Sequence, residues 1–202
     1  MSLITGLGRA TSSGSFSVRT ANAGTAGNSG ALSFISGTAT KGSSGGMMLQ
    51  TGSAVSGAGG SFSLLVGAGA SGAGGLVTVE AGESTDTTGG AVSLITGFGR
   101  SSSSGSFSVR TANAGAGTVG ISGALSFISG TASKGSSGGI MLQTGSAISG
   151  AGGSFSVIVG AGASGAGGLV TVDAGESTAS TGGAMSLITG LGRATSSGSF
   201  SV

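Results

Sequence analysis

The sequence contains no cysteine, proline, histidine, tryptophan or tyrosine. Without cysteine there is no disulfide and no thiol chemistry, and a chain without proline or a Gly-X-Y period cannot form a collagen triple helix. Charged residues make up only 6% of the chain, whereas disordered proteins combine high charge with few apolar residues. A net charge of +2 does not predict nucleic-acid binding. No apolar run approaches the ~20 residues that a membrane helix needs.

Glycine is abundant, with 48 residues in 202, and it marks a sequence repeat. Evenly spaced glycines begin most of the repeats, as at Gly45, Gly60 and Gly75. The repeats are themselves grouped into a longer period of six, because the stretch from 14 to 104 recurs as 105–197. We therefore expect one continuous domain over 1–202, with partial repeats at 1–13 and 198–202, and interpret the chain as an excerpt of a longer protein.

The third and fifth positions of each repeat carry large apolar residues, such as Phe62 and Leu64. Two apolar residues separated by one are typical of a strand, because successive side chains of a strand point to opposite faces. One strand per repeat has no partner within the repeat, so it would pair with the repeats above and below. The sequence thus predicts an all-β fold, a parallel β-solenoid of about 15 residues per coil with a six-coil super-repeat. We expect a thin two-layer core, with small tenth-position residues such as Ala54 opposite the large ones and glycine at corners of positive φ.

No catalytic, cofactor-binding or metal-binding residue is expected. The stretch 67–72 matches the dinucleotide motif Gly-x-Gly-x-x-Gly, but that motif works only between a strand and a helix. Lys41 and Lys134 could serve in a serine–lysine dyad, yet both lie in Lys-Gly-Ser-Ser turns that give no reason for a lowered pKa. We therefore predict that the chain is not an enzyme.

All the acidic residues fall into two clusters, at 80–86 and at 173–176. Five oxygen donors suggest a calcium site, but calcium-binding rolls place an aspartate in every nonapeptide, and Asp86 becomes Ala179 in the second cluster. A solvated set of charges is the favoured interpretation.

The sixth position alternates between polar and apolar residues from one repeat to the next. Because side chains of a strand alternate between its two faces, the sixth position points away from the face that carries the third and fifth positions and lies outside the predicted core. Its apolar members form a candidate lateral contact face, which either bundles copies or reflects strand propensity on a tolerant surface. The members of this face are Ile35, Leu65, Ile95, Ile128, Ile158 and Ile188.

The stretch 57–85, which reads Gly-Ala-Gly-Gly-Ser-Phe-Ser-Leu-Leu-Val-Gly-Ala-Gly-Ala-Ser-Gly-Ala-Gly-Gly-Leu-Val-Thr-Val-Glu-Ala-Gly-Glu-Ser-Thr, resembles the Gly/Ser/Thr-rich repeat tracts of giant extracellular proteins of diatoms and related algae. The likeness extends over the whole chain. It implies secreted structural or adhesive material at or outside the cell surface, although residues 1–9 lack the basic and apolar blocks of a signal peptide.

These observations predict a structural segment of an extracellular fibre, filament or adhesin stalk. Its partner would be further copies of itself, joined end to end and also laterally, because uncapped strand edges template further pairing. The alternative is a solenoid that binds ice, carbohydrate or a mineral surface through its wall of small residues. The missing Thr-x-Thr columns argue against ice.

Overall fold

A computed structural model describes residues 2–6, 13–115, 120–193 and 196–201. Over these ranges the chain contains no helix and no strand. The predicted β-solenoid is therefore wrong, and so is the all-β fold class. Within the same ranges, no helix is long and apolar enough to cross a membrane.

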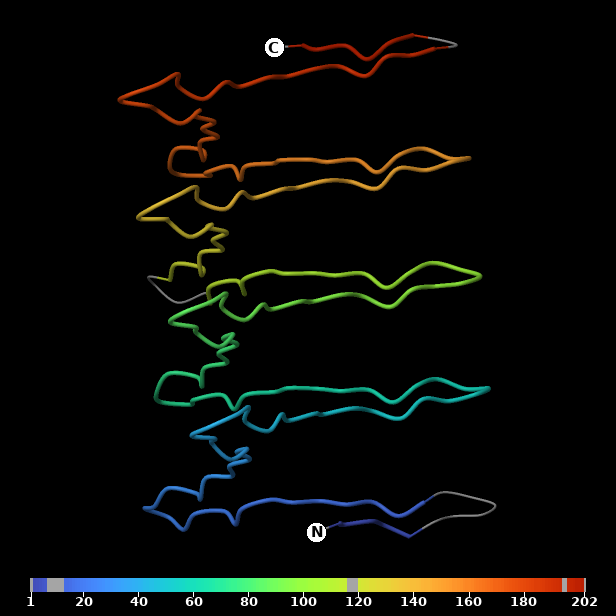
Figure 1. Cartoon of the computed structure of the whole chain (residues 1–202), viewed down its shortest axis with the longest axis vertical. Coiled ribbons are helices and arrows are strands. Elements are labelled where there is room, and N and C mark those ends of the chain that lie inside the picture. The colour runs from blue at the N-terminus through green and yellow to red at the C-terminus, as the bar shows by residue number, and fades with distance from the viewer. Residues whose placement is uncertain (1, 7–12, 116–119, 194–195, 202) are drawn as a thin grey trace. The chain divides into compact units, whose positions relative to one another are not determined.

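Extended segments alternate with bends, and the bends recur in register with the sequence repeat. The trace runs out along an extended arm, reverses at a bend and returns beside itself (Figure 1). A parallel solenoid needs every strand to run in the same direction, whereas a reversal makes the segments before and after it run in opposite directions. The described bends and turns lie at 25–27, 40–42, 55–57, 70–72, 85–87, 100–102, 133–135, 148–150, 163–165, 178–180 and 193.

Most of these reversals are closed by one backbone hydrogen bond between glycines. The N–H of the first glycine of a repeat donates to the carbonyl of the eighth-position glycine of the preceding repeat, as from Gly60 to Gly52 at 3.0 Å. The described residues contain nine such bonds, of 2.8 to 3.2 Å, whereas a folded protein has roughly one hydrogen bond per residue. A solenoid ladder would instead join equivalent positions of successive repeats, which lie further apart in the sequence. These hydrogen bonds therefore close short loops along the chain and do not join stacked repeats as predicted.

The structure has no buried core. None of the described residues is buried, and the accessible surface of the chain is 19825 Å². A compact monomer of 18.2 kDa would expose about 8,100 Å² and its unfolded chain about 26,400 Å². Even Phe62, expected in the core, is 66% exposed. The predicted two-layer core is therefore wrong, because the large apolar residues that would form it are exposed.

Gly69, at the tenth position of its repeat, has a different role from the one predicted for the tenth position. A Cβ added at Gly69 would come within 3 Å of the carbonyl oxygens of Gly72 and Ala73, which belong to its own bend and the segment after it. Glycine is thus required there by the tightness of the reversal, not by a facing wall of large residues. Positive φ, predicted at corners generally, occurs among the described glycines only at Gly42 (96°) and Gly135 (98°).

The chain divides into two units, Met1–Ile95 and Thr96–Val202. Each unit consists of extended segments and bends, and residues one six-repeat period apart have matching surroundings. Phe34 in the first unit and Phe127 in the second are 66% and 67% exposed. The sequence duplication therefore reappears as a duplication of local structure.

Candidate functional site

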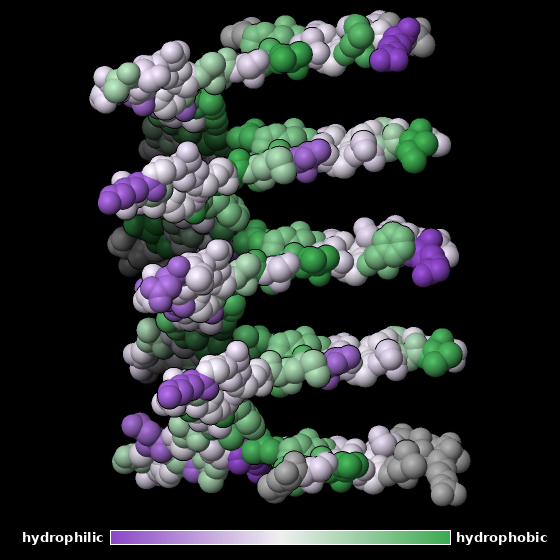
Figure 2. Space-filling model, in the orientation of Figure 1, coloured by the Kyte–Doolittle hydropathy of each residue, from purple (hydrophilic) through white to green (hydrophobic). Residues whose placement is uncertain are grey.

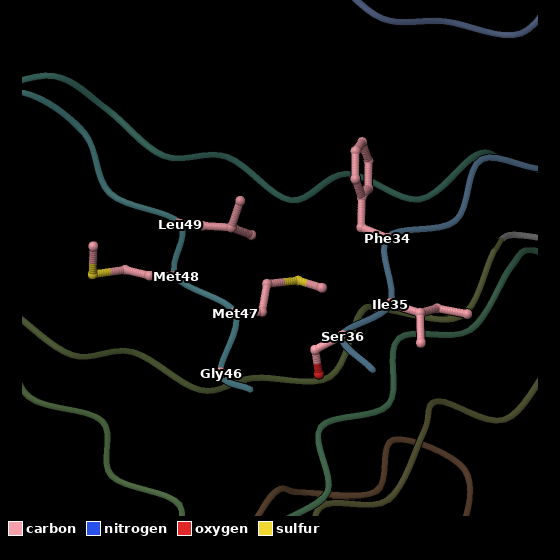
Figure 3. A pocket seen from close by; sticks show the side chains of 7 residues that line it. All are labelled: Phe34, Ile35, Ser36, Gly46, Met47, Met48 and Leu49. Carbon is pink, nitrogen blue, oxygen red and sulfur yellow. The ribbon is translucent and has the colours of Figure 1, made fainter. Parts of the chain in front are cut away.

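An apolar hollow of about 400 Å³ lies between two extended segments of the first unit, one before and one after the bend at 40–42. Met47 and Leu49 point from one segment toward the other, whereas Met48 and Ile35 point away on opposite sides (Figure 3). Third- and fifth-position side chains thus share one side of a segment, and fourth-position side chains take the other. The hollow is lined by Phe34, Ile35, Ser36, Gly46, Met47, Met48 and Leu49.

A second hollow, of about 490 Å³, is lined by residues 186–190 and 198–200 of the second unit. It too lies between segments on either side of a reversal, and Leu187 and Phe200 are among its apolar members. Neither hollow is lined by an ionisable side chain. Both are therefore suited to apolar side chains rather than to charged ligands.

The sixth-position residues of the candidate lateral contact face are more exposed than the apolar third- and fifth-position residues. Ile35, Leu65, Ile95, Ile128, Ile158 and Ile188 are 86–92% exposed, whereas the apolar third- and fifth-position residues are 49–75% exposed. Apolar residues lie open along the extended arms (Figure 2). The face therefore consists of separate large side chains that no part of their own chain covers.

Sequence reasoning missed further members of the exposed apolar set. Ile4 is 89% exposed, and it occupies the sixth position of the partial repeat before Gly14, so the repeat register could have identified it. Val55 and Ile148 are fully exposed at equivalent bends of the two units. No pattern in the sequence singles out these two, because their position carries small or polar residues in most other repeats.

The lysines, the glycine motif and the acidic residues that were considered for catalysis, cofactor binding or metal binding lie in exposed segments. Lys41 and Lys134 each precede a positive-φ glycine in a bend. The stretch 67–72 runs from an extended segment into a bend, and the following residues are extended rather than helical. Across the described ranges, no group of three or more acidic, histidine or cysteine side chains could hold a metal ion.

The bends beside the acidic residues are organised by hydroxyl groups. The Oγ of Ser84 accepts a hydrogen bond from the backbone N–H of Thr87 at 3.0 Å, and its counterpart Ser177 accepts one from Ser180 at 2.9 Å. Such side-chain bonds stabilise turns because they satisfy a backbone donor locally. These serines thus shape the bends.

Comparison of the chain with protein-family models, curated proteins and solved structures found no match.

Proposed function

We propose that the chain is a non-enzymatic structural segment that assembles with copies of itself into a fibre, filament or stalk outside the cell. The observation that carries this proposal is the complete absence of buried side chains among the described residues. Ordering the backbone costs roughly 1–2 kcal/mol per residue, and burial of apolar surface is the main term that offsets this cost. Because one copy does not supply that burial, other copies have to supply it.

The exposed area indicates how extensive the assembly is. The chain exposes about 11,700 Å² more than a compact monomer of its mass, while a standard interface covers about 800 Å² per partner. A single dimer contact therefore covers only a small part of the surplus. Association with several neighbours, as in a fibre or filament, would cover more of this surplus surface.

The backbone favours the same arrangement. Extended segments carry N–H and C=O groups that a neighbouring extended segment can bind, and such segments add readily to an exposed edge. With only nine backbone hydrogen bonds among the described residues, these groups are largely available to other copies. The two apolar hollows, which sit between extended segments, would take apolar side chains of a neighbour.

Light scattering and sedimentation velocity across a dilution series test this proposal. We expect a sharp rise in mass above a threshold concentration, accompanied by a β-type circular dichroism spectrum as segments of different copies pair. The control is the same chain in concentrated guanidinium, where it is unfolded, and this sample should remain monomeric. A chain that stays monomeric up to millimolar concentration would refute the proposal.

A further inference from the structure

The fourth position of each repeat carries serine or threonine throughout the chain, except in two repeats. The exceptions are Met48 and Met141, which occupy equivalent places in the two units, one six-repeat period apart. Their side chains are 81% and 82% exposed, whereas the third-position methionines Met47 and Met185 are 56% and 59% exposed. A strongly exposed methionine therefore recurs in both units at a position that otherwise carries a hydroxyl group.

The local structure leaves both of these thioethers open to solvent. Met48 points away from the segment that lies across the hollow from its own (Figure 3). The residue two positions before it, on the same side of an extended segment, is Gly46, and a Cβ added there would meet nothing within 4 Å. Met141 has Gly139 in the same place, with the same open space. No side chain at the second position thus shields either sulfur.

Methionine is the side chain of this protein that a peroxide oxidises most readily, because cysteine, tryptophan, tyrosine and histidine are absent. The sulfur lone pair attacks one oxygen of hydrogen peroxide, and the S–O bond forms as the O–O bond breaks. The hydroxide that leaves takes the proton of the transferred oxygen and becomes water. The sulfur is oxidised by two electrons to a polar sulfoxide, and a reductase that uses two thiols as reductant returns it to the thioether, with release of water.

We propose that Met48 and Met141 are oxidation sites through which a peroxide weakens assembly of the chain. This inference rests on the proposed self-assembly and adds a means of regulating it. In the reduced state, both side chains supply apolar surface that a neighbouring copy can cover. After oxidation the fourth position is polar in every repeat, and covering a sulfoxide costs free energy unless the neighbour provides a hydrogen-bond donor. Because reduction restores the thioether, the change is reversible.

Treatment with hydrogen peroxide below the assembly threshold, followed by removal of the peroxide with catalase, tests this proposal. Peptide mass mapping should show an added oxygen at Met48 and Met141 earlier than at Met47 and Met185, because the first two are more exposed. The assembly threshold of chains oxidised at Met48 and Met141 should rise about tenfold or more, since the apolar surface of these two side chains no longer stabilises the contact. A methionine sulfoxide reductase with a dithiol should restore the untreated threshold.

Paired variants separate these two sites from the other methionines. Met48→Leu with Met141→Leu keeps the apolar surface but cannot be oxidised there, so the same peroxide treatment should leave its threshold at the wild-type value. The matched control, Met47→Leu with Met185→Leu, should respond to peroxide as the wild type does. Met48→Gln with Met141→Gln introduces a polar side chain of similar length, and it should raise the threshold about tenfold without any peroxide.

The outcomes distinguish this inference from the proposed function. If chains oxidised at Met48 and Met141 assemble at the untreated threshold, the inference is overturned while self-assembly stands. An equal effect of peroxide on Met48→Leu with Met141→Leu also overturns it, because the sensitive residue would then lie elsewhere. Earlier oxidation of Met47 and Met185 overturns the assignment of the sites. Failure of the untreated wild type to assemble overturns the proposed function together with this regulation of it.

Discussion

The substitution Gly69→Ala tests whether a tight reversal, and not a packed wall, requires glycine at this position. An added Cβ would come within 3 Å of two carbonyl oxygens, those of Gly72 and Ala73, and Cβ atoms essentially never approach other atoms so closely. The obstacle is backbone, which cannot rotate away as a side chain can. The bend must therefore open, at a cost of about 1–3 kcal/mol by analogy with overpacking in a core.

The assay is the threshold concentration for assembly, measured by light scattering. A cost of about 1–3 kcal/mol corresponds to a rise of about 5- to 150-fold, because roughly 1.4 kcal/mol is a factor of ten. Gly67→Ala is the matched control, since a Cβ there meets nothing within 4 Å and the Gly67 carbonyl remains free to accept its bond from Gly75. The reasoning is refuted if the two variants assemble at the same threshold.

Two further substitutions probe the bends. Ser84→Ala removes the oxygen that accepts from the Thr87 N–H, so we expect a local loss of about 0.5–1.5 kcal/mol, seen as faster amide exchange at Thr87 in assembled samples; unchanged exchange would mean that the bond does not hold the bend. Gly42→Ala forces a side chain onto a residue with φ of 96°, which costs roughly 1 kcal/mol and raises the assembly threshold about fivefold. Gly46→Ala, which meets no atom within 4 Å and has no positive φ, should have no such effect, and equal thresholds for the two would contradict the argument.

The sequence allowed some of the local structure to be predicted but not the fold. The glycines at the first and eighth positions mark where the chain turns, and the alternation of Met47, Met48 and Leu49 indicates an extended segment with two faces. The period does not say whether a segment pairs with its counterpart in the next repeat or doubles back beside its neighbour. The bond from Gly60 to Gly52 closes a shorter loop, and loop closure costs less entropy when the loop is short.

The candidate contact face could be predicted only in part. The repeat register selected Ile35 and its equivalents as a set, and the structure gives them higher exposure than the apolar third- and fifth-position residues. Their role in contacting another copy stays a prediction, because exposure alone does not identify a partner.

The most direct test of the central claim is hydrogen exchange followed by mass spectrometry, above and below the assembly threshold. The account predicts that amides in the extended segments exchange at the rate of an unstructured chain at low concentration, because no described residue of a single copy is buried, and become protected only in the assembled state. Strong protection of these amides in a monomer, at a concentration where sedimentation detects no larger species, would contradict it.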